Sequence, residues 1–425
     1  MIWDDKRCVF LVGLVFVLGG CGENHSTPLD ASVSSDAGTV TYFGDVRPVL
    51  AEHCVGCHSV GGIGPFALDT YESAARLATR IKETTRDRIM PPWPADNSGE
   101  CNTFSGARWL DDAELAILAA WDEQGEPMGD PSTPAPTVPS LPTLTGSTST
   151  IETPVYAPST SASDDYRCFV VDAVQATDTY LTGFQVRPGN STMVHHVIVY
   201  APVNGSAANA ARSQDTGTGY PCFGGAGVNA YPVALWAPGS GATHYPENTG
   251  IRLIGGMPLI IQVHYNLLAA GDGTDQTRVD LETAARATNA GIVSVADLGL
   301  MLPPRVESVS TTHTENLSVL TGGADISLTI YGMFPHMHTL GRELRVEHLP
   351  HDSTESQCLI DVPRWNFNWQ LSYFFETPIT ISSLDSLRIT CTYDTRDRTL
   401  PVTWGEGTQD EMCINFLYVV AGGGL

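Results

Sequence analysis

The sequence has few basic residues. Lysine and arginine together number 22 in 425 residues, against 47 aspartates and glutamates, and the formal net charge is −25 at pH 7. Nucleic acids and anionic lipid headgroups attract proteins through clustered positive charge. We therefore expect no nucleic acid partner and no basic membrane-binding face, and we interpret the acidic residues as a solvated surface.

The chain also lacks an apolar run of comfortable membrane-spanning length. The apolar run at the N-terminus follows Lys6 and Arg7 and ends in Leu-Gly-Gly-Cys at Cys21. A basic start, a short apolar core and small residues predict an export signal over residues 1–21. The ending resembles that of a bacterial lipoprotein signal, which implies cleavage before Cys21 and lipid attachment to its thiol. An uncleaved anchor helix is the alternative.

These features predict an exported protein: a periplasmic or outer-membrane lipoprotein, or one at the cell surface. Residues 22–39, rich in Ser, Thr, Asp, Ala and Gly, predict a flexible tether to the membrane. Outside the cytoplasm disulfides can form. Cys8 and Cys21 belong to the expected export signal and its lipid attachment, and two further cysteines belong to the motif described below. Six cysteines remain, an even number that permits up to three disulfides: Cys101, Cys168, Cys222, Cys358, Cys391 and Cys413. Counting alone does not give their connectivity.

The first folded region, residues 40–126, contains a C-x-x-C-H haem-attachment motif formed by Cys54, Cys57 and His58. Two thiols one helical turn apart can add to the two vinyl groups of a haem, and the adjacent imidazole then reaches the iron. A zinc site would require a second Cys/His pair at comparable spacing, and none lies nearby. We therefore expect a covalent c-type haem.

Met90 is the expected second axial ligand of this haem. It stands just before a proline pair, which cannot continue a helix and favours an extended loop. A thioether held opposite a histidine raises the reduction potential of a haem. His53 and Met128 are the alternatives, in which case Met90 serves only in packing.

Helices are predicted around these ligands at residues 46–53, 71–84 and 111–124, with Asp111 as the N-cap of the last. With the haem motif, this pattern resembles a small class I cytochrome c domain. Residues 127–150, rich in Pro, Ser and Thr, predict a semi-extended linker to the next domain.

From residue 151 on, helical periodicity gives way to short runs of Val, Ile, Thr, Tyr and Phe. Examples occupy residues 195–202, 258–268 and 326–334, and clusters of Gly, Pro, Asn and Asp separate them. This pattern predicts antiparallel sandwiches or barrels. About 275 residues favour two domains over one. We place their boundary near residues 295–305, which gives domains at 151–300 and 301–425.

Two groups of histidines lie on these predicted strands. His336 and His338 share one face of a strand, so their imidazoles can converge on a metal ion while Met337 points away. Two surface histidines are the alternative. His195 and His196 are adjacent and should face opposite sides, so their joint ligation requires a bulge or a strand end.

His264 ends another predicted strand, and it could complete a three-histidine site with His195 and His196. One core histidine with two solvent-exposed ones is the alternative. Met412, beside Cys413, offers a thioether. A thioether added to the pair His336 and His338 suits copper that cycles through Cu(I), whereas an all-imidazole site would also take zinc.

The order of these motifs over residues 155–425 is HH, then H, then HxH, then Glu-Met-Cys. It resembles the copper type II, ascorbate-dependent monooxygenases, the group that contains the peptidylglycine alpha-hydroxylating and dopamine beta-monooxygenases. The resemblance implies an electron-transfer copper and an oxygen-binding copper, held respectively by His195, His196 and His264, and by His336, His338 and Met412.

The resemblance also implies the fold and two bridges. The two coppers would lie in two jelly-roll-like domains that face each other across a solvent-filled cleft. Cys391 would pair with Cys413, and Cys168 with Cys222, while the pairing of Cys101 and Cys358 stays open. The expected fold class is multidomain: a small all-α cytochrome c domain followed by two all-β jelly-roll-like sandwich domains.

The chain departs from the peptide-hydroxylating members at two positions. Those enzymes place an arginine two residues before the first histidine of HxH, where this chain has Phe334. They place a tyrosine four residues after the ligand methionine, where this chain has Phe416. A pocket without the arginine should not favour a peptide with a free carboxylate, because the anion loses its charge-assisted partner.

The expected function is hydroxylation of a C–H bond in a small organic substrate with O2, by an exported enzyme that carries haem c and two copper ions. An ascorbate-like reductant or a respiratory chain would supply the electrons, through the haem to the three-histidine copper and then to the oxygen-binding copper. The alternative is an electron-transfer or copper-handling lipoprotein without hydroxylase activity.

Overall fold

The computed structural model describes residues 38–60, 64–139, 142–146, 148–159, 163–172, 175–223, 225–238, 240–267 and 273–422. The expected export signal, the lipid-bearing Cys21 and all but the last two residues of the expected tether lie outside these ranges. Residues 1–39 and 40–425 form separate units, and the second is described here. Among the described helices, none has the length and apolar character needed to cross a membrane.

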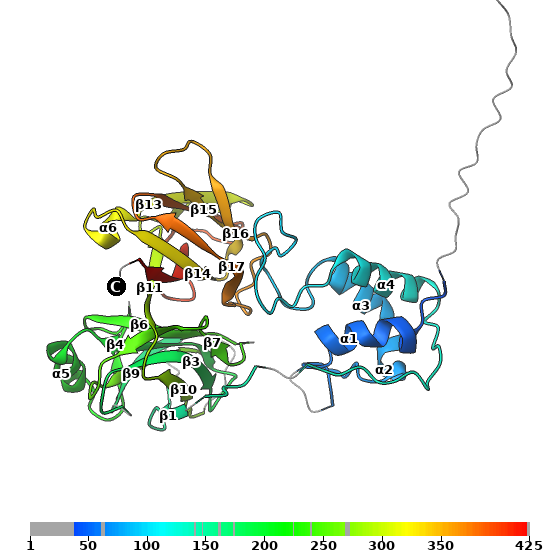
Figure 1. The fold of residues 1–425 in the computed structure, drawn as a ribbon, viewed down its shortest axis with the longest axis horizontal. Helices are drawn as coiled ribbons and strands as arrows, with labels where there is room; N and C mark the ends of the chain where they lie inside the picture. The colour runs from blue at the N-terminus through cyan, green and yellow to red at the C-terminus, as the bar shows by residue number, and fades with distance from the viewer. Residues whose placement is uncertain are drawn as a thin grey trace, which may run out of the picture. The chain divides into compact units, whose positions relative to one another are not determined.

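The helical region contains a π-helix and four α-helices, which Figure 1 draws in blue and cyan: η1 Tyr42–Val46, α1 Arg47–His53, α2 Tyr71–Ala75, α3 Ala78–Arg86 and α4 Asp112–Glu123. Asp111 caps α4, as predicted. Its carboxylate accepts from the N–H of Glu114, whose side chain accepts from the N–H of Asp111, so the two form a capping box. The single helix expected at residues 71–84 is instead α2 and α3, which meet at Leu77.

The start of the expected linker is attached to the helical region. Pro127 and Met128 accept backbone hydrogen bonds from η1, at 2.8 Å from Tyr42 and 3.1 Å from Phe43. The Arg47 guanidinium donates to the carbonyls of two further linker residues. At its other end, strand β1 already begins at Thr148. The part that could act as a spacer is therefore shorter than predicted.

After residue 147 the described chain is mostly strand, with two short helices. Helix α5 is Gly205–Gln214 and α6 is Ser318–Thr321. The strands are β1 Thr148–Glu152, β2 Asp164–Val171, β3 Thr179–Arg187, β4 Val194–Pro202, β5 Tyr220–Pro221, β6 Ala230–Trp236, β7 Thr243–His244, β8 Thr249–Leu253, β9 Leu259–Asn266, β10 Arg278–Ala284, β11 Thr288–Ala296, β12 Met301–Leu302, β13 Val309–Asn316, β14 Ser327–His336, β15 Gly341–Leu349, β16 Gln357–Val362, β17 Tyr373–Ser382, β18 Ser386–Tyr393, β19 Val402–Thr403 and β20 Ile414–Ala421. The strands predicted at 195–202, 258–268 and 326–334 are confirmed as β4, β9 and β14.

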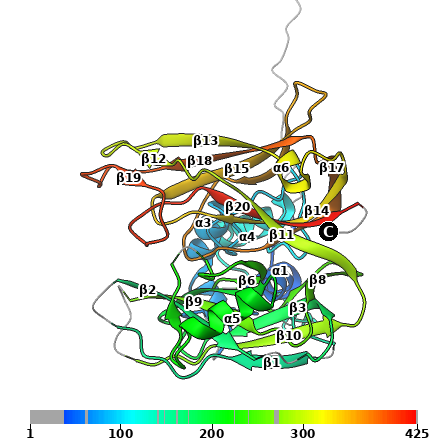
Figure 2. The same cartoon turned by 90° about the vertical axis from the view of Figure 1, so that its left-hand side faces the viewer.

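The described strands form two sandwiches that share one sheet. The shared sheet has nine strands in the order β1-β10-β3-β8-β11-β20-β14-β17, with β7 beside β3. The N-terminal sandwich packs the sheet β5-β2-β9-β4-β6 against the β10-β3-β8 end, and the C-terminal sandwich packs β13-β18-β15-β16 against the β20-β14 end. Figure 2 shows β13, β18 and β15 above β20, β14 and β11.

Strands β14 and β20 contribute to both cores. Met333 and Leu417 are buried in the core of the C-terminal sandwich, whereas their neighbours Phe334 and Tyr418 belong to the core of the N-terminal sandwich. Successive residues of a strand point to opposite faces, so a strand buried on both sides has a nearly continuous apolar sequence. The two sandwiches are thus one packed body at this sheet.

Residues 91–108, called here the docking segment, leave the helical region and enter the C-terminal sandwich. The backbone N–H of Asp96 donates to Asp361 at 2.8 Å, and that of Ser105 donates to Phe374 at 2.8 Å. Trp93 and Phe104 are buried in the same core as Tyr373. Sequence patterns do not predict this integration, because the segment has no apolar period of its own.

Three disulfides are present: Cys101–Cys358, Cys168–Cys222 and Cys391–Cys413. The second and third are the pairs that the family resemblance implies. The first, whose pairing was open, fixes the docking segment to β16 across a sequence separation of 257 residues. A bridge that closes so long a loop removes much entropy from the unfolded chain.

We expect replacement of both Cys101 and Cys358 by serine to lower the free energy of unfolding by about 3–5 kcal/mol and to expose the docking segment. Denaturant unfolding and limited proteolysis, with cleavage mapped by mass spectrometry, measure the two effects. The control variant replaces Cys168 and Cys222 by serine. Their disulfide closes a shorter loop, and its loss should not increase cleavage within residues 91–108. Equal cleavage in both variants would contradict the assignment of the docking segment to the C-terminal sandwich.

Candidate metal centres

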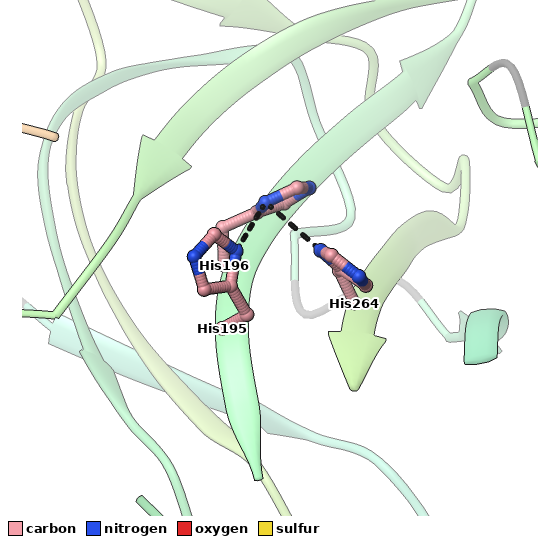
Figure 3. Close-up of side chains that lie close together, drawn as sticks. All are labelled: His195, His196 and His264. Atoms are coloured by element: carbon pink, nitrogen blue, oxygen red, sulfur yellow. Dashed lines mark hydrogen bonds between the residues drawn. The ribbon is translucent and has the colours of Figure 1, made fainter. Parts of the chain in front are cut away.

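A bulge in β4 brings two adjacent histidines to the same side. The register between β4 and β9 shifts between Val194 and His196, so His195 has no partner in the ladder, while His196 lies opposite His264. The bulge that joint ligation by His195 and His196 requires is therefore present. Figure 3 shows the three imidazoles turned toward one another.

The three imidazoles converge through their Nδ1 atoms. The Nδ1 atom of His196 lies 3.3 Å from that of His195 and 3.4 Å from that of His264. One ring nitrogen of each histidine lies within 4.8 Å of those of the other two, a spacing that could hold a single metal ion.

Asp164, on β2, orients one of these rings. Its Oδ1 atom accepts from Nε2 of His264 at 2.8 Å, so the ring proton is at Nε2 and the Nδ1 lone pair faces the cluster. Burial alone would raise the pKa of Asp164, but hydrogen bonds from His264 and Thr408 hold this pKa well below its usual range. The ring of Tyr166 stacks on His264 at 4.0 Å between centroids.

Burial keeps the histidines of this cluster neutral. It lowers the pKa of His195 to about 3 and that of His196 well below its usual value. At neutral pH both rings therefore offer lone pairs, which metal binding requires. Three neutral imidazoles with converging nitrogens fit a copper ion.

The second group lies where β14 ends. His336 is the last residue of the strand, His338 follows two residues later, and their rings are 5.2 Å apart between centroids. Met337 between them is fully buried in the core of the C-terminal sandwich. The two imidazoles share one side and Met337 the other, as the spacing predicted.

Both rings of this group are oriented through Nδ1. His336 donates from Nδ1 to Oε1 of Gln370 at 2.5 Å, and His338 donates from Nδ1 to the carbonyl of Asp410 at 3.0 Å. Each Nε2 is then left with a free lone pair. Burial lowers the pKa of His338 to about 4, so this ring is also neutral.

Met412 and Glu411 complete the second group. Met412 precedes β20 and lines the same cavity as His336 and His338. The buried Glu411 carboxylate accepts from the backbone N–H groups of His338 at 2.9 Å and Leu340 at 2.6 Å, and thereby holds the loop that presents His338. Burial raises the pKa of Glu411 to about 7. Two imidazoles with a thioether fit copper that cycles through Cu(I).

One cavity of about 250 Å³ borders both groups, the first through His196 alone and the second through His336, His338 and Met412. The rings of His196 and His336 lie only 5.9 Å apart between centroids, so the two groups nearly touch. The solvent-filled cleft that the resemblance implies is therefore a small cavity in this structure. Phe334 and Phe416 both line it, and among its described lining residues none is lysine or arginine. Other apolar lining residues are Ile198, Leu235, Trp236, Leu371, Trp404 and Ile414.

Sequence reasoning missed three residues that orient the candidate ligands: Asp164, Gln370 and Glu411. Asp164 is 100 residues from His264, and Gln370 is 34 residues from His336, so no local pattern connects them. Glu411 was visible within the Glu-Met-Cys motif, but its role depends on the distant loop that it holds.

The structure gives the surroundings of some of the candidate haem residues. Among the described cysteines, Cys54 and Cys57 are the ones outside disulfides. His58 donates from Nδ1 to the carbonyl of Phe66 at 3.1 Å, which leaves Nε2 for a metal. Of the alternatives to Met90, His53 is bound to Glu114 through Nε2 at 2.9 Å, and Met128 is exposed.

Most of the strand-rich part of the chain matches a known protein family. Residues 151–270 match the N-terminal domain, and residues 288–420 the C-terminal domain, of the family described as copper type II ascorbate-dependent monooxygenase. The matches divide the chain somewhat before the boundary predicted near residue 300. In the solved structures, the major capsid protein P2 of bacteriophage PM2 aligns with 66% of this chain and 100% of its own, at 10% identity and a TM-score of 0.29, which is too low to support an argument.

Proteins with similar sequences are also named as monooxygenases or hydroxylases. The DBH-like monooxygenase protein 2 of Mus musculus is 29% identical over 54% of this chain and 38% of its own length. Dopamine beta-hydroxylase of Canis lupus familiaris and tyramine beta-hydroxylase of Caenorhabditis briggsae are each 26% identical over 55% of this chain, and the match covers 39% and 40% of them. The matched part spans about two fifths of these relatives. Because the two family matches together cover more than half of the sequence, the chain belongs to the copper type II ascorbate-dependent monooxygenase family.

Proposed function

We propose that this protein is an exported monooxygenase that uses copper and haem to hydroxylate a C–H bond of a small organic substrate with O2. The observation that carries this proposal is the pair of different donor sets on one apolar cavity. Bound copper would supply one-electron redox chemistry and the activation of O2.

The residues of each set suit a different task. His195, His196 and His264 would hold the electron-transfer copper, with Asp164 fixing the ring of His264. Three imidazoles suit copper, and this set contains no soft sulfur ligand that would favour Cu(I). In the other set, the soft thioether of Met412 favours Cu(I), the state that reacts with O2.

The lining of the cavity indicates which kind of substrate would fit. Its walls are mainly aromatic and aliphatic, and the lining contains no cationic side chain in the described residues. A small, apolar molecule without a carboxylate therefore fits best, because a buried anion would lack a partner. Exclusion of water around His336 and His338 would keep the oxidant from reacting with solvent.

Residues 40–126, apart from the docking segment, would form the cytochrome c domain, with haem c held by Cys54, Cys57, His58 and Met90. Two observations support this assignment besides the thiols and the Nδ1 hydrogen bond of His58. Nε1 of Trp93, and Nε and Nη2 of Arg364, are buried without a hydrogen-bond partner in the described part of the chain. Buried donors of this kind would suit the carboxylates of a haem.

The proposal also includes the expected cellular setting. The chain would be lipidated at Cys21 and act in the periplasm, at the outer membrane or at the cell surface, with copper domains at 151–300 and 301–425. An ascorbate-like reductant or a respiratory chain would donate the electrons. No nucleic acid partner is proposed.

The short distance between His196 and His336 favours one competing function. Rings 5.9 Å apart leave little room for a substrate between them and would suit electron exchange between two coppers. The competing proposal is therefore an electron-transfer or copper-handling lipoprotein that performs no hydroxylation.

Reduction of the haem- and copper-loaded protein without air, followed by a pulse of O2, tests the first proposal against the second. We expect rapid haem reoxidation that the His338→Ala variant loses, because the oxygen-binding copper loses a ligand. His313→Ala is the control, since its ring lies on β13 and contacts Glu315. Haem reoxidation that is unchanged in His338→Ala would separate the haem from O2 chemistry.

Replacement of Asp164 by alanine should lower the copper affinity of the three-histidine set by about 10–100-fold, because the ring of His264 loses the carboxylate that orients it. Titration with Cu(I) against a competing chelator measures this affinity. The matched control is Asp165→Ala, which removes the neighbouring carboxylate that accepts from Tyr156 at 2.6 Å. If Asp164→Ala binds two coppers as tightly as the native protein, the assigned role of Asp164 is wrong.

A further inference from the structure

The docking segment fastens the helical region to the C-terminal sandwich at several points. Besides the disulfide, the amide of Asn102 donates to the carbonyls of Cys358 at 3.0 Å and Leu359 at 2.9 Å. Phe104 forms an isolated antiparallel bridge with Phe375. The part of the chain that follows the haem-attachment motif is therefore fixed to a domain of different fold.

Buried donors without a partner lie on both sides of this junction. Nε1 of Trp93, in the docking segment, is one of them, and Nε and Nη2 of Arg364 are two more in the described part of the chain. Arg364 follows β16, and the N–H of its neighbour Trp365 donates to the carbonyl of Arg342 at 2.8 Å, so its backbone is part of the C-terminal sandwich. Because a buried N–H group without an acceptor costs free energy, these donors indicate an acceptor that is not a protein group.

Positive charge gathers beside Arg364. Burial lowers the pKa of its guanidinium, and the guanidinium of Arg88, two residues before Met90, lowers it further. The carboxylates of Asp96 and Asp361 act in the opposite direction, but within the described ranges neither forms an ion pair with Arg364. A buried guanidinium is unfavourable without an anion, so the place suits an anionic ligand.

The same junction adjoins the candidate haem residues. Met90 stands three residues before Trp93 in the sequence. At the other end of the docking segment, burial lowers the pKa of Arg108, and the groups that oppose this effect electrostatically are Cys57 and Tyr373. Tyr373 also receives the ring of Trp93, at 5.0 Å between centroids. Cationic and N–H donors are thus present beside both the attachment motif and the expected second axial ligand.

We propose that Arg364, Trp93 and Arg108 hold the two carboxylates of the haem, so that the C-terminal copper domain completes the haem site. The proposal rests on the proposed covalent haem. Carboxylates satisfy the buried N–H groups and neutralise the guanidinium charge at the same time, and the planar guanidinium matches a carboxylate with two parallel hydrogen bonds. The haem then fastens two domains that the chain also joins through a disulfide.

A free anion such as phosphate offers the same donors the same chemistry. The haem carboxylates are the better match, because covalent attachment at the motif keeps them beside the donors and the burial of the donors disfavours exchange with solvent. A free anion would leave the properties of the haem independent of Arg364, and this difference decides between the two sources.

Arg364 is in this arrangement a positioning residue with an electrostatic effect. Ferrous haem carries one positive charge less than ferric haem, so a nearby cation favours the ferrous state and raises the reduction potential. The C-terminal sandwich thereby contributes to the potential of a haem that is attached in another domain.

The test uses the full-length protein with haem attached. Redox titration followed by haem absorbance measures the reduction potential, and resonance Raman spectroscopy reports the bending vibration of the haem carboxylates. We expect Arg364→Leu to lower the potential and shift this vibration, and Arg364→Lys, which keeps the charge, to restore most of the potential. Arg342→Leu is the matched control, because its guanidinium belongs to β15 of the same sandwich and lies 3.6 Å from Asp394. It should leave both readouts unchanged.

A second variant keeps the proposal testable if Arg364→Leu fails to fold. Trp93→Phe retains a buried ring on Tyr373 and removes only the N–H donor, so we expect a shifted carboxylate vibration without loss of the fold. Native potential and native vibration in Arg364→Leu, or a native vibration in Trp93→Phe, would overturn the proposal and leave the proposed haem standing. Purified native protein without haem absorbance would overturn the proposed haem together with this inference.

Discussion

The pairing of β14 with β20 is the constraint on which the rest of the structure depends. In this register His336 lies opposite Ile414, which places Met412 two residues beyond the end of the ladder and near the imidazoles that leave β14. The same two strands supply alternate residues to the cores of both sandwiches. A shift by one residue would exchange these faces and separate the thioether from the histidines. The disulfide Cys391–Cys413 holds the start of β20 against β18 and so protects this register.

The two metal groups differ in how the protein presents their nitrogens. In the three-histidine group the Nδ1 atoms face one another, and the carboxylate of Asp164 accepts a hydrogen bond from Nε2 of His264. In the second group Nδ1 is used for hydrogen bonds to Gln370 and the carbonyl of Asp410, so Nε2 is presented. Burial keeps the rings neutral in both. These hydrogen bonds decide which nitrogen His264, His336 and His338 offer, and the two sites on the cavity are therefore dissimilar.

Local patterns in the sequence predicted much of this arrangement. The strand runs, the shared side of His336 and His338, the Asp111 cap and the need for a bulge at His195 all follow from the period of two residues in strands or from cap chemistry. The shared sheet, the integration of Trp93 and Phe104 into a distant core, and the orienting roles of Asp164 and Gln370 could not be predicted. Each joins residues far apart in the sequence, and packing, rather than any local preference, determines which of them meet.

The central claim is that two donor sets of different chemistry, one of them containing the Met412 thioether, hold two copper ions beside one cavity. X-ray absorption spectroscopy of the fully reduced protein loaded with Cu(I) tests it most directly. The account predicts two coppers per chain and a sulfur scatterer in addition to imidazole nitrogen. It also predicts that Met412→Leu removes the sulfur signal and leaves the three-histidine copper bound. A native spectrum with nitrogen and oxygen ligands alone, or a sulfur signal that survives in Met412→Leu, would contradict the account.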